Sequence, residues 1–227
     1  MTVYERFAEN HSATPALDIP GFSLEERRVD LPSPFLKRAL DISISLIVLV
    51  LFAPVLASIA LLICLDTQGP VFFCQTRLGL NGKPFDILKF RTMNVLENGD
   101  SIRQAHEGDP RITPAGHFLR RLSLDELPQL INVLKGEMSL VGPRPHAVAH
   151  DVLYGAAIAD YDFRQRVKPG ITGWAQVHGL RGPTPTLESM QARVERDIWY
   201  VVNRRFLLDV EILFRTVAEV FRSRNAV

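Results

Sequence analysis

"ISISLIVLVLFAPVLASIALLICL", residues 42–65, constrains the arrangement of the whole chain. None of these 24 positions carries a charged side chain. As one helix the segment would be about 36 Å long, which exceeds the roughly 30 Å hydrocarbon core of a bilayer. The segment starts too far from the N-terminus, and lacks the small-residue pattern, for a cleavable signal peptide. We therefore expect this part of the chain to enter a membrane.

The flanks of this segment and its central proline leave two topologies open. Lys37 and Arg38 precede it, and further basic side chains follow from Arg77 onward, so the positive-inside rule draws both flanks toward the cytoplasm. Pro54 removes the hydrogen bond to the carbonyl of Val50 and permits a sharp bend. A helix that dips into the bilayer and returns would satisfy both features. From the residues alone, the commoner kinked span is preferred.

Composition bounds the remaining chain. Residues 1–36 are rich in Glu, Ser and Pro and lack clear periodicity, which predicts a mobile N-terminal tail. A net charge of +1 over 227 residues gives no indication of a nucleic-acid partner. Cys64 and Cys74 fit neither a disulfide framework nor a zinc spacing, which favours a reducing compartment.

A β-hairpin is predicted directly after the apolar segment. In "GPVFFCQTRLGLNGKPFDILKFRTM", residues 69–93, two short apolar stretches flank the turn signal "LNGKP". Lys89 and Arg91 alternate with Phe90, so both cations can point to one face of the strand. Such a face is more often simply solvated. Further on, Thr113 followed by Pro114 predicts a helix start.

"SLDELPQL", residues 123–130, places Asp125 and Glu126 side by side. Ser123 with Glu126 spells a capping box, but Pro128 would then occupy a helical position that requires a backbone N–H. A helix that starts near Pro128 and ends near Gly136 is the better prediction. Both acids then lie at the N-terminus of this helix, where unpaired N–H groups favour anions. From these residues alone, a helix-capping role and a catalytic role of the two acids remain equally open.

"GEMSLVGPRPHAV", residues 136–148, encloses Arg144 between Pro143 and Pro145. We expect Gly142 to adopt an unusual backbone angle just before them. A rigid loop holds a guanidinium in place at low entropic cost, and its planar fork suits bidentate binding of phosphate. As an isolated feature, such a loop is more often only a stiff turn.

"VKPGITGWAQVHGLRG", residues 167–182, contains four glycines in a spacing that matches no nucleotide-binding fingerprint. Its composition is typical of an ordered loop that lets a ligand approach closely. His178 within it could act as a general base, but a structural role is commoner. The two helical runs that follow combine broad apolar faces with Trp199 and Arg204, which suits either core packing or a lipid interface.

Taken in order, five motifs make the chain recognisable. They resemble the monotopic phosphoglycosyl transferases, bacterial sugar transferases that move a sugar 1-phosphate from a nucleotide sugar to a polyprenyl phosphate. The resemblance runs from about Lys37 to the C-terminus. The motifs are "KRALD", "KFRTM", "RRLSLDELPQLINVLKGEMSLVGPRP", "KPGITGWAQVHGLRG" and "WYVVN…LLDVEILFRTV".

The resemblance implies a fold class and a location. The fold is α+β and mostly helical, with a re-entrant helix–break–helix in the bacterial inner membrane, a small β-hairpin and amphipathic helices along the bilayer surface. This implication outweighs the preference for a kinked span. It divides the chain into a tail at 1–36, a re-entrant membrane helix at 37–66 and a catalytic domain on the cytoplasmic face at 67–227.

The resemblance also implies site residues. Asp125 becomes the covalent nucleophile and Glu126 a ligand of Mg²⁺, because a carboxylate is ionised at neutral pH and a hard cation takes oxygen ligands. One departure concerns the helix break, where some relatives have Ser and this chain has Ala53 before Pro54; Ser58 or a neighbouring helix would have to satisfy the freed carbonyl. The candidate phosphate-binding residues are Lys89, Arg91, Arg120, Arg121 and Arg144, the last held by Pro143 and Pro145.

The implied reaction moves a hexose 1-phosphate from UDP-glucose or UDP-galactose to undecaprenyl phosphate and releases UMP, through an aspartyl intermediate. It would begin the synthesis of an exopolysaccharide or a related glycoconjugate. Two other classes remain as alternatives: a membrane-anchored phosphohydrolase, and a non-catalytic membrane scaffold in which the acid pair is only a cap. The sequence does not indicate which hexose is used or how many copies assemble.

Overall fold

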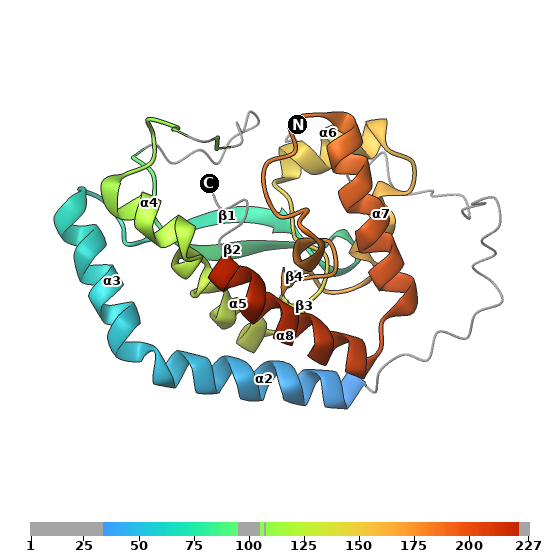
Figure 1. The fold of residues 1–227 in the computed structure, drawn as a ribbon, viewed down its shortest axis with the longest axis horizontal. Helices are drawn as coiled ribbons and strands as arrows, with labels where there is room; N and C mark the ends of the chain where they lie inside the picture. The colour runs from blue at the N-terminus through green and yellow to red at the C-terminus, as the bar shows by residue number, and fades with distance from the viewer. Residues whose placement is uncertain (1–33, 95–104, 107, 223–227) are drawn as a thin grey trace.

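The computed structural model describes residues 34–94, 105–106 and 108–222. The predicted mobile tail lies outside the described residues except for positions 34–36, which belong to the first helix. The described chain is α+β and mostly helical, as expected, with two small sheets (Figure 1). The helices are α2 (Pro34–Leu51), α3 (Ala53–Asp66), α4 (Pro114–Arg121), α5 (Gln129–Lys135), α6 (Val148–Ala157), α7 (Leu187–Asn203) and α8 (Phe206–Arg222); the strands are β1 (Phe72–Leu78), β2 (Pro84–Phe90), β3 (Ser139–Val141) and β4 (Gly170–Thr172).

The apolar segment forms two helices that meet at a bend of 63°. Pro54 lies at the start of α3, and the hydrogen bond from Phe52 to the carbonyl of Val48 (2.9 Å) persists before it. Ser58 donates to the carbonyl of Pro54 (2.9 Å), so its hydroxyl does not serve the carbonyl of Val50. Among the described residues no single helix is long and apolar enough to cross a bilayer, but the bent pair together meets that test as a broken span or a re-entrant loop.

The first turns of α2 are fastened to the globular domain by charged side chains. Arg38 donates to the carbonyls of Val133 (2.6 Å) and Leu134 (2.7 Å) in the last turn of α5. The buried carboxylate of Asp41 accepts from the hydroxyl of Ser139 and from the following N–H of β3, both at 3.0 Å. Cations at a helix C-terminus are favourable because they meet unpaired carbonyls and the negative end of the dipole. The "KRALD" motif is therefore an anchor.

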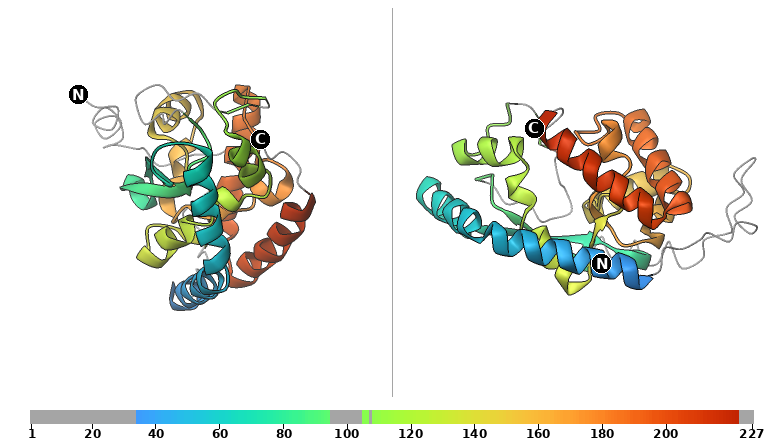
Figure 2. Two further views of the ribbon diagram at one scale, coloured as in Figure 1. Left: turned by 90° about the vertical axis from the view of Figure 1, so that its left-hand side faces the viewer. Right: turned by 60° about the horizontal axis from the view of Figure 1, so that its bottom comes forward.

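The far end of α3 is fastened to the same domain. Arg91 donates to the carbonyls of Thr67 (2.7 Å) and Gln68 (2.6 Å), which follow α3. The carboxylate of Asp66 accepts from the backbone N–H of Ala115 in α4 (3.4 Å). Figures 1 and 2 show α2 and α3 as a bent arm along the outside of the domain, with the rest of the chain to one side of it. Both ends of the bent pair thus contact one folded unit.

The predicted β-hairpin is confirmed. Strands β1 and β2 pair antiparallel, with Phe72 opposite Phe90 and Leu78 opposite Pro84. The turn between them contains Asn81 in the left-handed region (φ 55°), as its "NG" sequence favours. A second sheet was not predicted: β3 and β4 pair in parallel, with Ser139 opposite Gly170.

Thr113 accepts from the backbone N–H of Gly116 (2.9 Å) and Pro114 begins α4, so the predicted helix start there is confirmed.

One hydrophobic core unites the hairpin, the short sheet and the last two helices. Leu207, Phe214 and Val217 of α8 remain outside the core and are exposed. The core includes Phe85, Ile87, Leu130, Val133, Met138, Leu140, Val141, Tyr200, Val201, Leu208 and Ile212.

Replacing Asp41 with Ala should detach the start of α2. The change leaves a buried N–H and the Ser139 hydroxyl without their acceptor, so we expect a loss of about 2–3 kcal/mol in the free energy of unfolding. Chemical denaturation of the detergent-solubilised protein measures it. Asp86→Ala is the matched control, because that aspartate is exposed and its carboxylate accepts from the hydroxyl of Thr76 on the neighbouring strand (2.9 Å). Equal effects of the two substitutions would contradict the anchoring role.

Candidate active site

The acid pair lies in a tight turn directly before α5. A 3₁₀ turn covers Leu124–Glu126, and α5 starts after Pro128 and ends at Gly136 (φ 86°), as predicted. The capping box that Ser123 and Glu126 could have formed is absent, because Ser123 adopts a left-handed conformation (φ 60°) and its side chain makes no cap hydrogen bond in this turn. A non-glycine residue in this region is strained, and such strain is common where a turn must aim a functional group.

Glu126 is enclosed by cations. The Arg144 guanidinium makes a two-point contact with its carboxylate, with Nη1 at 3.0 Å from Oε2 and Nη2 on Oε1. The ammonium of Lys89 lies 3.0 Å from Oε1. Burial alone would raise the pKa of Glu126, but the charges of Arg144 and Lys89 outweigh it and hold that pKa well below the ordinary value. Glu126 is therefore a firmly ionised, fixed anion.

Asp125 is equally buried, at 7% exposure against 8% for Glu126, but its surroundings differ. Within the part of the chain that the structure describes, its carboxylate has no hydrogen bond or ion pair. Burial, followed by the neighbouring charge of Glu126, raises the pKa of Asp125 to about 6. Above that pH Asp125 is an ionised carboxylate with unused lone pairs on a largely buried side chain.

The predicted phosphate-binding residues separate into two groups. Lys89 and Arg144 contact Glu126, and the charge of Arg120 acts on Asp125 while its guanidinium lies 3.4 Å from the hydroxyl of Thr92. Arg91 is not beside the acid pair: it is buried and bonded to the end of α3, so it does not share a face with Lys89. The last, Arg121, is exposed at the end of α4.

Arg181 is a site residue that sequence reasoning missed. It donates to the hydroxyl of Ser123 (2.5 Å), and its charge acts on Glu126 and Asp125. The signal was its position between two glycines in the loop expected to approach a ligand, where Gly179 is left-handed (φ 81°). Four cations, Lys89, Arg120, Arg144 and Arg181, thus act on two carboxylates and leave an excess of two positive charges. The site is suited to an anion.

The loop that carries Arg144 packs closely against residues 168–170, and Gly142 has a different role from the one predicted. Gly142 has no positive φ; a Cβ there would instead lie 2.4 Å from the carbonyl of Lys168. Close packing of two backbones is therefore what requires glycine. His178 binds the carbonyl of Trp174 (2.7 Å) and lies against that ring, which is the structural role expected for it.

The residues present are compatible with a magnesium ion, although the described chain has no cluster of three or more His, Cys, Asp or Glu side chains. Mg²⁺ typically binds one or two protein carboxylates together with substrate phosphates. A carboxylate offers about four lone-pair positions, and among the described residues Oε2 of Glu126 accepts from Arg144 alone. The adjacent carboxylate of Asp125 supplies a second hard oxygen donor.

Comparison with known proteins defines the class. Residues 32–223 match the model of the bacterial sugar transferase family, and the chain belongs to that family. The chain is 53% identical over 191 residues to a UDP-glucose:undecaprenyl-phosphate glucose-1-phosphate transferase of Escherichia coli (strain K12), covering 84% of this chain and 41% of that relative. A protein of the same name from Caulobacter vibrioides is 49% identical over 207 residues, covering 91% of this chain and 76% of the relative.

A third relative carries a different name. The UDP-N-acetylgalactosamine-undecaprenyl-phosphate N-acetylgalactosaminephosphotransferase of Aeromonas hydrophila is 40% identical over 199 residues, covering 86% of this chain and 47% of that protein. The chain therefore spans less than half the length of two of these three relatives.

A buried carboxyl near the Arg144 loop yields a pH prediction. Asp151 accepts from the hydroxyl of Tyr161 (2.8 Å), and burial raises the pKa of Asp151 to about 7. The raised folded-state pKa means that the stability which this group contributes is present at low pH and lost as pH rises through about 7. Asp151→Asn removes the ionisable group, so the variant should not lose this stability as pH rises.

Thermal unfolding of wild type and Asp151→Asn at about pH 5 and about pH 8.5 tests this sign. The difference in Tm, variant minus wild type, should be more positive at the higher pH. A difference that is independent of pH would mean that Asp151 stays ionised in the folded protein.

Proposed function

We propose that this protein transfers a hexose 1-phosphate from a UDP-sugar to undecaprenyl phosphate, with release of UMP. The observation that carries the proposal is the contrast within the acid pair: the carboxylate of Asp125 has no hydrogen bond or ion pair within the described chain, whereas that of Glu126 is held by Arg144 and Lys89. The printed names of the relatives, which contain a UDP-sugar and undecaprenyl phosphate, support the donor and acceptor classes.

The chemistry follows from the position of Asp125. Its carboxylate oxygen attacks the β-phosphorus of the UDP-sugar, the bond from that phosphorus to the bridging oxygen breaks, and UMP leaves with the electron pair. The enzyme then holds an aspartyl phospho-sugar. A phosphate oxygen of undecaprenyl phosphate attacks the same phosphorus and displaces Asp125, which restores the free carboxylate. Two half-reactions at one carboxylate imply ping-pong kinetics.

The surrounding cations stabilise the charge that this reaction concentrates. Phosphoryl transfer depends mainly on positioning and electrostatic stabilisation, and fixed guanidinium groups supply both. Lys89, Arg120, Arg144 and Arg181 are assigned to the diphosphate and to the departing UMP. Glu126, with substrate oxygens, would hold Mg²⁺, which when bound would neutralise diphosphate charge.

A re-entrant membrane helix accounts for the anchoring of the bent pair. A spanning helix would place its ends on opposite faces of the bilayer, where one domain could not contact both. Arg38 and Asp41 fasten the start of α2, while Arg91 and Asp66 fasten the end of α3. The apolar bend between them is exposed, as is one face of α8. We assign the domain to the cytoplasmic face of the bacterial inner membrane, with α8 along the lipid surface.

UDP-glucose is the first donor to test, because two relatives carry glucose in their names. UDP-galactose differs at one hydroxyl and is the second. The relative from Aeromonas hydrophila carries an N-acetylated sugar in its name, so exclusive use of such a donor would overturn this preference.

The central test supplies donor without acceptor. Wild-type protein with UDP-glucose and Mg²⁺ should release about one UMP per active site in a burst, and rapid-quench mass spectrometry should find a phosphohexose on Asp125. Asp125→Asn should abolish the adduct and lower turnover by about a thousandfold or more, because the amide keeps the shape but not the nucleophile. A parallel reaction with a chelator measures the need for the metal.

The same experiment separates the alternatives. A phosphohydrolase would release hexose phosphate continuously without acceptor, and a scaffold would give neither burst nor adduct. If both substrates must bind before UMP leaves and no adduct forms, direct transfer is the better account.

Topology has its own test. With Cys64 and Cys74 replaced, single cysteines at Asn10 and Asp100 should both be shielded from a membrane-impermeant thiol reagent in intact cells, and both should react after permeabilisation. A cysteine placed in the periplasm of a known membrane protein is the positive control. Labelling of the Asn10 position alone in intact cells would establish a span.

A further inference from the structure

We infer that Arg164, held by Asp197, is a positioning residue that sets the location of the Arg144 guanidinium in the active site. The inference rests on the proposed function, in which Arg144 binds the reacting diphosphate. It concerns two residues that lie in other elements: Arg164 in the 3₁₀ segment Tyr161–Arg166, and Asp197 on α7.

The loop around Arg144 can be held through few groups. Pro143 and Pro145 have no N–H, so the carbonyls are the main backbone anchors. Three successive carbonyls are all bonded: that of Pro143 accepts from the N–H of Gly170 (2.9 Å), that of Arg144 from Arg164 Nη2 (2.5 Å), and that of Pro145 from Arg77 Nη1 (3.3 Å). Two of the three donors are guanidinium groups, which make the stronger, charge-assisted bonds.

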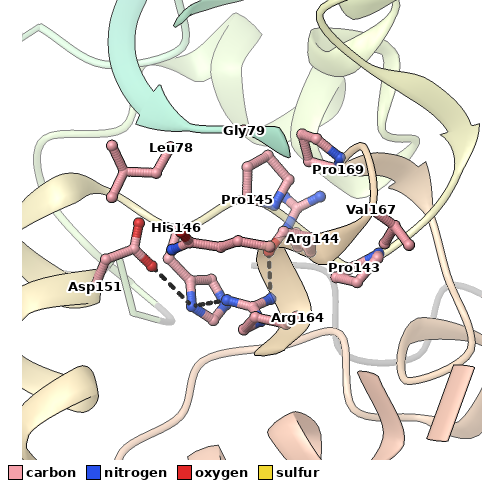
Figure 3. Close-up of a pocket in the computed structure, with 11 residues that line it drawn as sticks. Leu78, Gly79, Pro143, Arg144, Pro145, His146, Asp151, Arg164, Val167 and Pro169 are labelled. Atoms are coloured by element: carbon pink, nitrogen blue, oxygen red, sulfur yellow. Dashed lines mark hydrogen bonds and ion pairs between the residues drawn. The ribbon is translucent and has the colours of Figure 1, made fainter. Parts of the chain in front are cut away.

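Arg164 is itself fixed from several directions. Arg164 is 4% exposed, and its guanidinium donates through Nε (3.2 Å) and Nη2 (2.7 Å) to Oδ2 of Asp197. Its Nη1 donates to Nδ1 of His146 (2.7 Å) and to the hydroxyl of Tyr161 (3.2 Å). Figure 3 shows Arg164 beside His146 and the Arg144 loop, with dashed lines from Arg164 to His146 and to the Arg144 carbonyl.

The protonation state of His146 agrees with this arrangement. A guanidinium has no acceptor, so Nδ1 of His146 must accept from it, and the proton of the neutral ring lies on Nε2. Burial, followed by the charge of Arg164, holds the pKa of His146 well below its usual range. The positive charge next to the Arg144 loop is therefore that of Arg164, which is paired with Asp197, and His146 is neutral.

The resulting line of contacts runs from α7 to the reacting carboxylates. Asp197 orients Arg164, Arg164 fixes the Arg144 carbonyl, and the Arg144 side chain holds Glu126 beside Asp125. A displacement of about 1 Å in a substrate-positioning group can cost about a hundredfold in rate. An ordinary core ion pair would contribute to stability alone; this pair should contribute to catalysis through Arg144.

A double-mutant cycle tests this with the full chain and an assay of UMP release from UDP-glucose with undecaprenyl phosphate. Arg164→Lys keeps the charge toward Asp197, but an ammonium on a shorter stem cannot also reach the Arg144 carbonyl. We expect it to lower kcat/KM by about tenfold or more in the wild-type background, and by about twofold or less in an Arg144→Lys background. Arg77→Lys, which releases the Pro145 carbonyl, should show a smaller loss with the same non-additivity.

Arg166→Lys is the matched control. Arg166 lies in the same 3₁₀ segment but stacks on the ring of Phe163, so its replacement should leave kcat/KM unchanged in both backgrounds. Thermal unfolding verifies that each variant is folded, and the cycle with Arg77 decides the question if Arg164→Lys is not.

The outcomes are separable. Equal fold-losses in both backgrounds would overturn the inference, because Arg164 would then act independently of Arg144. An unchanged rate for Arg164→Lys would overturn it as well. Absence of UMP release by the wild-type chain would instead reject the proposed function.

Discussion

The contact between Arg38 and the C-terminal carbonyls of α5 is the constraint on which the rest of the structure depends. The seven residues of α5 form a short helix whose opposite end carries the acid pair. A guanidinium on those carbonyls satisfies two groups that the helix cannot pair internally and meets the negative end of its dipole. The position of the acid pair relative to the bent apolar helices is thereby set by one short element, which matters for the proposed transfer to a lipid acceptor.

Two adjacent carboxylates acquire different properties because their neighbours differ. Both are buried to the same degree, so desolvation alone would treat them alike. Arg144 and Lys89 bond to Glu126 and hold its pKa down, whereas Asp125 has only the more distant influence of the cations and the repulsion of Glu126. Pairs of titratable groups driven apart in this way commonly have separate chemical roles. One acid is suited to hold charge in place and the other to react.

The site is held in place by hydrogen bonds from residues that lie well outside it. The Arg144 loop is bonded along successive carbonyls, and the groups that bond it are fixed by α7 and by the buried cluster of His146, Tyr161 and Arg164. Prolines restrict the loop but remove its donors, so charged side chains from distant segments must complete it. The close approach of Gly142 to residues 168–170 belongs to the same design, because it brings β4 against the start of the loop.

The sequence by itself determined the features that depend on neighbouring residues. The hairpin turn at Asn81, the helix start at Thr113 and the limits of α5 at Pro128 and Gly136 were all predicted, because turns and caps are encoded within a few positions. The motifs indicated the family and with it the acid pair. Only the tertiary structure decided the pairing of β3 with β4, the turn of Arg91 toward α3, and the entry of Arg181 into the site. A long cationic side chain reaches in several directions, and the partner it meets depends on segments that folding brings from far along the chain.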